Sequence, residues 1–220
     1  MSDTAYLALY FDAPLQSWGY ASKFDRRTTL AHPTRSGVIG LLCAAMGIDR
    51  SDMPGLARLE QSLGVDVYAF RLGNRLTDYH TVGGGYDPKT EPLRICRKAS
   101  GKIGDTVQTW REYLEDARFG VVVSGSVVLI DSLADAVRDP VWGLWLGRKS
   151  CVPASRVFEG VHADTDAALV ALREAYGDSD AVVVRKVVEG KSFDDGNDTI
   201  MDRPLDFSGR HFAARRICVE

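Results

Sequence analysis

Long hydrophobic runs are missing from this sequence. No stretch approaches the ~18 uncharged apolar residues from which a membrane-spanning helix is built, so we expect no membrane segment. The first residues, Met1 to Thr4, place no basic group before an apolar run, which argues against a signal peptide. Both absences favour a protein that stays in the cytoplasm.

Cysteine is scarce, with 4 residues in a chain of 220, and no two of them form a C-x-x-C pair. Their wide spacing favours free thiols in a reducing cytosol over a zinc site; they are Cys43, Cys96, Cys151 and Cys218. The acidic run 194–198 lacks the alternating ligands and the closing glutamate of an EF-hand calcium loop. We therefore expect no metal and no other cofactor.

Motifs of nucleotide-dependent enzymes are also missing. Neither a G-x-x-x-x-G-K-[ST] phosphate loop nor a G-x-G-x-x-G dinucleotide fingerprint occurs around Gly37 and Gly40. The histidines are scattered, and nothing in the sequence pairs them as a general acid and base; they are His32, His80, His162 and His211. The sequence therefore favours a binding protein over an enzyme.

The charge is unevenly distributed along the chain. The net charge of −3 argues weakly against nucleic-acid binding. However, the segment 71–111 has 8 basic and 4 acidic residues, whereas 161–208 has 5 basic and 11 acidic residues. This distribution leaves some segments free to present a basic face, with ordinary solvated surface charge as the alternative.

Hydrophobic periodicity predicts both strands and helices. Strands are expected over 5–11, 65–72, 119–130, 181–188 and 211–219, of which 119–130 is one long strand or a hairpin. Helices are expected over 36–46, 53–63, 132–138 and 164–176. Thr34 is the expected N-cap of the first helix and Gly47 ends it, while the acidic stretch 191–209 is expected to be a loop.

The segment 73–107 is too long for an ordinary loop in a compact domain, and β-branched residues at its ends allow an extended hairpin arm. The order β-α-α-β-arm-β-α, then α-β-loop-β, predicts an α+β fold with a mostly antiparallel sheet. A ferredoxin-like, or RRM-like, core with elaborations fits this order best. We expect an RNA-binding domain over 1–160, with the arm at about 73–110, and a small β-rich C-terminal subdomain over 161–220 that completes the fold.

The stretch from Pro33 to Gly37 opens the first helix and has features of an anion site. A helix N-terminus offers unpaired backbone N–H groups and the positive end of the helix dipole, both of which attract phosphate. Arg35, together with Arg26 and Arg27, adds cations that form charge-assisted hydrogen bonds. Taken alone, the same pattern fits a tightly packed helix with a proline before it.

Two other features allow contact with nucleic acid without requiring it. Trp18 lies in a polar stretch, where it either stacks on RNA bases or anchors the core. The arm is basic, which suits a clamp on a nucleic-acid backbone or a disordered loop equally well; its cations are Arg94, Arg97, Lys98 and Lys102.

Six stretches occur in one order along the chain: Pro14-Leu15-Gln16-Ser17-Trp18-Gly19; Arg27-Thr28; Pro33-Thr34-Arg35-Ser36-Gly37-Val38-Ile39-Gly40-Leu41-Leu42; Asp78-Tyr79-His80-Thr81-Val82; Thr106-Val107-Gln108-Thr109-Trp110-Arg111-Glu112-Tyr113-Leu114; and Leu146-Gly147-Arg148-Lys149-Ser150-Cys151. Together they resemble the CasD family, the Cas-five subunit of type I-E CRISPR Cascade complexes. The resemblance covers roughly residues 5–160 and is weak beyond them, apart from the closing basic strand.

The resemblance implies a RAMP-type, RRM-like fold in which the arm is an inserted β-hairpin thumb. Members of the family cap the 5′ end of the CRISPR RNA and hold its repeat-derived handle. They contact the backbone subunit CasC and the large subunit CasA, and we expect contact with target DNA only through the complex. The expected RNA-binding residues are Gln16, Trp18, Arg26, Arg27, Thr34, Arg35, Ser36, Gly37, His80, Gln108, Trp110, Arg111, Gly147, Arg148, Lys149 and Ser150.

The sequence departs from the family pattern at two places. Lys149 stands where arginine is common, which keeps the charge but loses the planar fork, and Ala13 stands where glycine often precedes the proline. The alternative function is a metal-independent ribonuclease that cuts repeat RNA, as the related type I-C subunit does. Tyr20, Lys23 and His32 would supply its acid–base set.

Overall fold

A seven-stranded antiparallel sheet forms the body of the protein in the computed structural model, which describes residues 3–20, 22, 25–83, 86, 87, 89–95, 106–190, 192 and 194–220. The strand order is β10-β11-β9-β4-β7-β1-β8. The strands are β1 (Thr4–Asp12), β4 (Gly64–Arg71), β7 (Arg118–Ser126), β8 (Phe158–His162), β9 (Arg185–Glu189), β10 (Asp198–Asp206) and β11 (His211–Val219). The helices are α1 (Arg35–Met46), α2 (Met53–Ser62), α3 (Val127–Arg138) and α4 (Thr165–Tyr176), with a short 3₁₀ helix, η1, at Pro92–Arg94.

The centre of this sheet is a ferredoxin-like core. In chain order, β1, α1, β4, β7, α3 and β8 form a β-α-β-β-α-β unit, and their strands lie in the order β4-β7-β1-β8. This is the arrangement of an RRM-like fold. The predicted α+β class, antiparallel sheet and ferredoxin-like core are therefore confirmed.

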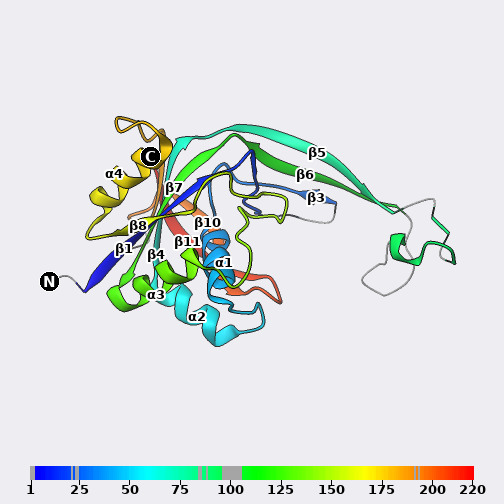
Figure 1. The fold of residues 1–220 in the computed structure, drawn as a ribbon, viewed down its shortest axis with the longest axis horizontal. Helices are drawn as coiled ribbons and strands as arrows, with labels where there is room; N and C mark the ends of the chain where they lie inside the picture. The colour runs from blue at the N-terminus through cyan, green and yellow to red at the C-terminus, as the bar shows by residue number, and fades with distance from the viewer. Residues whose placement is uncertain are drawn as a thin grey trace.

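The two faces of the sheet are covered by different helices (Figure 1). Side chains alternate across a strand, so Leu7, Leu9 and Phe11 of β1 face the larger core beneath α1, α2 and α3. Ala8 and Tyr10 of the same strand face a smaller cluster that packs against α4. Burial on both faces explains why β1 is an almost unbroken apolar run.

A long two-stranded hairpin extends from the body (Figure 1). Strands β5 (Asn74–Val82) and β6 (Val107–Glu115) pair from Asn74 opposite Glu115 to Val82 opposite Val107. The short strand β2 (Leu15–Gln16) pairs with β6 at the base of the hairpin, and β3 (Arg26–Arg27) pairs with β6 midway along it, at Trp110 and Arg111. The predicted hairpin thumb is confirmed, and β6 ends at Glu115, five residues past the expected end of the arm at about 110. Arg97, Lys98 and Lys102 lie outside the described residues, as does Cys96.

Helix α1 begins and ends at the predicted caps. The Thr34 hydroxyl accepts a hydrogen bond from the Gly37 amide at 3.1 Å, and Gly47 adopts the left-handed conformation with φ of 71°. Helices α2 and α4 also confirm the predicted ranges, and their N-caps are Asp52 and Asp164. Within the described residues, no helix combines the length and apolar character needed to cross a membrane.

The predicted strand over 119–130 is wrong in its last part, because β7 ends at Ser126 and α3 begins at Val127. Ile130, Leu133 and Val137 are buried at helical spacing, whereas Val128 is 82% exposed. Val121–Val123 and Val127–Val128 lie on either side of the short stretch Ser124-Gly125-Ser126, and the β-branched residues on both sides hide the change from strand to helix period.

The predicted loop over 191–209 is also wrong, since it contains β10. Asp202 of β10 points inward and pairs with a buried arginine, so the buried positions are not all apolar and the alternation is hard to recognise. Strand β8 was not predicted, and β9 begins at Arg185 rather than at Ala181, which packs beneath α4.

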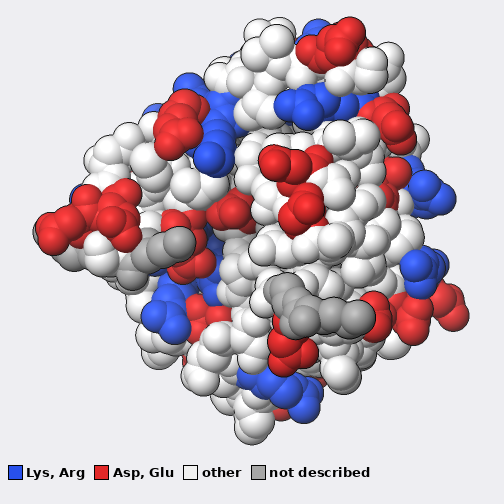
Figure 2. All heavy atoms as spheres, turned by 90° about the vertical axis from the view of Figure 1, so that its left-hand side faces the viewer, with Lys and Arg blue, Asp and Glu red and all other residues white. Residues whose placement is uncertain are grey.

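Strands β9, β10 and β11 join the same sheet as β1, β4 and β7. Residues after 160 therefore complete the fold by extending one sheet, and the division of the chain at residue 160 stays a prediction. The end of the molecule remote from the hairpin carries acidic and basic side chains interspersed, without a continuous basic surface (Figure 2).

Candidate nucleic-acid interface

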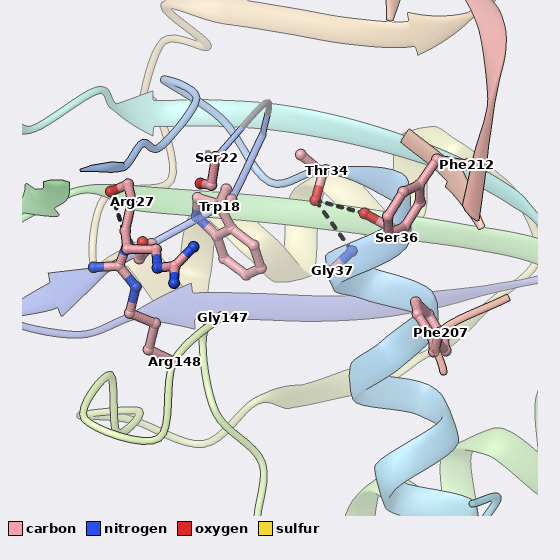
Figure 3. Close-up of a pocket in the computed structure, with 12 residues that line it drawn as sticks. Trp18, Ser22, Arg27, Thr34, Ser36, Gly37, Gly147, Arg148, Phe207 and Phe212 are labelled. Atoms are coloured by element: carbon pink, nitrogen blue, oxygen red, sulfur yellow. Dashed lines mark hydrogen bonds between the residues drawn. The ribbon is translucent and has the colours of Figure 1, made fainter. Parts of the chain in front are cut away.

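A cavity of about 250 Å³ opens where four segments of the chain meet (Figure 3). The segments are the loop after β2, the first turn of α1, the turn at Gly147 and the connection between β10 and β11. The lining residues are Ser17, Trp18, Gly19, Ser22, Arg27, Thr34, Ser36, Gly37, Gly147, Arg148, Phe207 and Phe212. Two of the segments predicted to line one RNA site, 16–40 and 147–150, are therefore adjacent in space.

The backbone at Gly147 lies directly against the backbone at Ser17. The Ser17 amide donates to the Leu146 carbonyl at 3.0 Å. Gly147 has φ of 100°, and a Cβ built on it would lie 1.8 Å from the Ser17 carbonyl oxygen. A side chain at this position is excluded both by conformation and by space, so the sequence requires glycine here.

Arg148 fastens the Gly147 turn to the base of the thumb. Its Nη1 donates to the Glu112 carbonyl at 3.1 Å and its Nη2 donates to the Arg27 carbonyl at 2.8 Å. The guanidinium also lies over the Tyr113 ring, 4.6 Å from the centroid. These contacts make Arg148 a half-buried brace in the cavity wall, while Lys149 and Ser150 beside it are exposed.

Gln16 and Trp18 are buried, with 0% and 1% of their surface exposed. The Gln16 amide nitrogen donates to the carbonyls of Phe11 and Ala117, and its oxygen accepts from the Trp18 indole N–H at 3.2 Å. Trp18 also stacks on Phe11, with ring centroids 5.4 Å apart. These contacts contradict the expectation that Gln16 binds bases directly, because its amide is occupied behind the cavity wall. Trp18 is anchored in the core but also lines the cavity, so its contact with RNA stays a prediction.

Arg35 is 3% exposed and points into the protein. Its Nη1 donates to Glu189 Oε2 at 3.0 Å, and its Nη2 donates to the carbonyls of Glu60 and Leu63 at 2.6 and 2.8 Å. Its Nε lies 3.4 Å from Glu60 Oε1. The predicted phosphate contact of Arg35 is contradicted, since these groups already surround its guanidinium.

The N-terminus of α1 is largely occupied by protein groups. The Arg35 amide donates to Asp202 Oδ2 at 2.7 Å, and the Gly37 amide donates to the Thr34 hydroxyl. Thr34 is itself 2% exposed. The Asp202 carboxylate thus occupies the positive end of the α1 dipole, where a phosphate was expected. Ser36 and Gly37 still line the cavity.

Two predicted residues, Arg26 and Trp110, lie along the thumb outside the cavity, together with Tyr79, which was not predicted. Tyr79 and Trp110 are in contact, with ring centroids 5.4 Å apart, and Arg26 lies over Trp110 at 5.8 Å. Tyr79 is 52% exposed. This arrangement offers an aromatic and cationic surface of the type that stacks single-stranded bases.

The other predicted thumb residues have different surroundings. Gln108 is exposed, and Arg111 is partly buried, where its Nε donates to Thr109 Oγ1 at 3.1 Å. His80 lies on the neighbouring strand opposite Thr109, and its Nδ1 is buried without a hydrogen-bond partner among the described residues.

Sequence reasoning missed Phe207, Phe212 and Ser22 as cavity residues. Both phenylalanines are half-buried and lie on the opposite side of the cavity from Trp18 (Figure 3). A search for aromatic residues at the ends of predicted strands would have found Phe212, at the start of the predicted strand 211–219, but Phe207 only if β10 had been recognised.

The residues proposed for a ribonuclease do not form a described acid–base set. His32 is 9% exposed, and burial lowers its pKa to about 4, so it is neutral at pH 7. Tyr20 is partly buried against the core, and Lys23 lies outside the described residues. A neutral, buried histidine is a poor general acid.

No group of three or more histidine, cysteine or carboxylate side chains in the described part of the chain is arranged to hold a metal ion. Cys43 and Cys151 are buried free thiols, and burial raises the pKa of Cys43 to about 11. Such a thiol is largely protonated and unreactive at neutral pH.

Comparison with known proteins places this fold in one family. The chain matches the model of the CRISPR-associated protein family (Cas_Cas5) over residues 6–218. It is 34% identical to the CRISPR system Cascade subunit CasD of Escherichia coli (strain K12), an alignment that covers 96% of this chain and 93% of the relative.

Two solved structures are similar over almost the whole chain. One is a chain of a CRISPR RNA-guided surveillance complex, with a TM-score of 0.78, 32% identity and coverage of 98% of this chain and 89% of the other. The second, described as the crystal structure of a Cas protein, has a TM-score of 0.66, 29% identity and coverage of 98% and 93%. This chain therefore belongs to the CRISPR-associated Cas5 family and resembles its CasD members.

Proposed function

We propose that this chain is a non-catalytic subunit of a cytoplasmic Cascade ribonucleoprotein, in which it binds and caps the 5′ handle of the CRISPR RNA. Neighbouring subunits would be a CasC-type backbone protein and a CasA-type large subunit, and target DNA would be met through the complex. Its similarity to the E. coli Cascade subunit CasD and to a chain of an RNA-guided surveillance complex supports this assignment.

The observation that carries the proposal is the cavity beside Arg27, Gly147 and Arg148. It is open at the surface and combines arginines with half-buried phenylalanines, the groups that bind phosphates and splayed bases in single-stranded RNA. Its volume suits a small part of a ligand, such as one nucleotide, better than a folded duplex.

The thumb would guide the RNA away from the cavity. Arg27 lines the cavity and Arg26, the preceding residue, lies over Trp110 on the thumb, so the basic strand β3 connects the two surfaces. In contrast, the opposite end of the molecule has mixed charges (Figure 2). A strand leaving the cavity would therefore be held along β3 and β6.

Binding rather than cleavage is favoured by the groups present at the cavity. The described lining contains no histidine and no carboxylate that could act as a general acid or base. His32 is buried and is close in sequence to the lining residue Thr34, but it does not line the cavity itself. Cleavage in the intact system is therefore assigned to another protein.

The proposal is tested by RNA binding to the full chain. Fluorescence anisotropy should show tighter binding of a labelled handle oligonucleotide, defined by sequencing RNA co-purified with the complex, than of a scrambled oligonucleotide of equal length. Arg27→Ala should weaken handle binding about tenfold, the effect of one charge-assisted hydrogen bond. It should also make the slope of log K against log salt shallower by about 0.7.

The matched control is Arg156→Ala, which removes the same side chain from a separate cavity and should bind the handle like the parent protein. Equal affinity of the parent protein for handle RNA and scrambled RNA would contradict the proposed capping role. Site-specific cleavage of repeat RNA by the purified chain without metal would instead establish the ribonuclease alternative.

A further inference from the structure

We propose that Arg35 and Asp202 are positioning residues for RNA, which act by clamping the β10–β11 hairpin against the start of α1. The clamp holds Phe207 and Phe212 as the aromatic wall of the cavity, where they receive an unpaired base. This inference rests on the proposed function, and it gives a role to residues that do not themselves reach the cavity surface.

Asp202 is the centre of the clamp. It is 2% exposed, and its Oδ2 accepts from the backbone amide of Arg35 at 2.7 Å. Its carboxylate also forms a two-point contact with Arg215 of β11, at 2.7 Å from Nε and 3.1 Å from Nη2. One carboxylate therefore joins both strands of the hairpin to the first residue of α1.

The Arg35 side chain extends these contacts to α2 and β9. It pairs with Glu60 of α2 and Glu189 of β9, while Arg203 of β10 forms its own two-point contact with Glu60, at 2.6 and 3.1 Å. The hairpin is thus tied to the helical layer at Asp202 and again at Arg203. Two ties on one strand fix its direction as well as its distance from α1.

The aromatic wall lies at the end of this clamped hairpin. Phe207 follows β10 directly, and Phe212 is the second residue of β11. Phe207 rests against α1, where its Cζ lies 3.6 Å from the position that a Cβ on Gly40 would occupy. Figure 3 shows both rings on the α1 side of the cavity, across from Trp18 and Arg148.

Aromatic rings at such a position bind bases by stacking, with little dependence on charge. In some proteins a buried ion pair selects one arrangement while adding little to net stability, and loss of one partner leaves a buried charge uncompensated. Disruption of the clamp should therefore move the wall and weaken base stacking, while the number of phosphate contacts stays the same.

The experiment measures handle-RNA affinity at several salt concentrations for the full chain and five variants, of which Asp202→Asn, Phe212→Leu and their combination test the clamp and the wall. Asp202→Asn and Phe212→Leu should each weaken binding about tenfold or more, as expected for a lost base stack. Neither should change the salt slope, because neither residue contacts phosphate. The double variant Asp202→Asn/Phe212→Leu should bind RNA about as tightly as whichever single variant binds it less tightly, because both substitutions affect the same aromatic wall.

The stability control is Leu133→Ala, which shortens a buried side chain of α3 and destabilises the core. Leu133 is remote from the β10–β11 hairpin, so this variant should keep an RNA affinity near the parent value. A reduced salt slope in Asp202→Asn or in Arg35→Lys would overturn the inference in favour of direct phosphate contact. If Asp202→Asn fails to fold, normal binding by Phe212→Leu overturns it instead. Failure of the parent to prefer handle RNA rejects the proposed function and not the clamp alone.

Discussion

The carbonyl oxygen of Ser17 occupies the space that a side chain on Gly147 would need, at 1.8 Å from an ideal Cβ. This contact joins two segments separated by about 130 residues, and both residues line the cavity. Glycine is thus required at position 147 for two separate physical reasons: its φ is 100°, and the Ser17 backbone lies too close for a side chain.

Gly147→Ala should destabilise the protein by about 3 kcal/mol or more, since a backbone shift is needed in addition to left-handed strain. Gly177→Ala is the matched control, because Gly177 has φ of 89° but no atom within 4 Å of its Cβ position. It should cost only about 1 kcal/mol. Urea unfolding of both variants separates strain from contact, and equal losses would contradict the close approach.

Arg148→Lys should not preserve the brace between the Gly147 turn and the thumb. Lysine keeps the charge but cannot donate to the carbonyls of Arg27 and Glu112 from one planar group. We expect a loss of about 1–3 kcal/mol in unfolding free energy and weaker handle binding. Wild-type stability and affinity in this variant would indicate that charge alone matters at Arg148.

Trp110→Leu tests the thumb surface. If Trp110 stacks a base, the variant should lose about 1–3 kcal/mol of binding free energy for handle RNA. Trp142→Leu is the control, since Trp142 is 45% exposed and belongs to neither the thumb nor the cavity. Equal affinities of the two variants, measured by anisotropy at one salt concentration, would argue against stacking on the thumb.

His32 should make stability depend on pH between about 6.5 and 4. The pKa of His32 is lowered to about 4 in the folded protein, mainly by burial; Asp202 opposes this shift, and Arg185 and Arg215 add to it. Between the two values the unfolded chain binds a proton that the folded chain does not, so stability falls as the pH falls. The loss approaches about 3 kcal/mol and is complete below pH 4.

The measurement is the unfolding free energy of the parent and of His32→Gln at pH 7.5, 6, 5 and 4.5. The stability of the parent relative to the variant should decrease across this range. Other groups, such as Asp66, whose pKa is raised mainly by burial, titrate in both proteins and cancel in the difference. Parallel curves would show that His32 is not held neutral by the fold.

Much of the fold could be predicted because local signals and tertiary packing agree. Thr34 and Gly47 mark the ends of α1 by well-defined capping chemistry, and the alternation in β4 matches its two buried faces. Secondary-structure prediction failed where the local sequence signal and the tertiary packing disagree. The valines around Ser126 suit either a strand or a helix, and Asp202 presents a charge to the interior that only its partner Arg215 makes acceptable.

The site was harder to predict than the fold, for a physical reason. Arg35 and Gln16 lie in the right part of the molecule, but whether an arginine or an amide meets solvent depends on partners such as Glu60 and Ala117 that are distant in sequence. Three of the four segments that meet at the cavity were predicted from motifs in one order, but the connection between β10 and β11 was not. The direction of each side chain required the tertiary structure.

The order in which the chain is synthesised adds a constraint on when RNA can be captured. Trp18, Gly37 and Arg148 leave the ribosome well before Phe207 and Phe212, which close the cavity on its remaining side. Nascent chains fold from their N-terminal parts as they emerge. On the proposed function, a partly translated chain therefore presents an incomplete cavity, and loading with guide RNA awaits the β10–β11 hairpin.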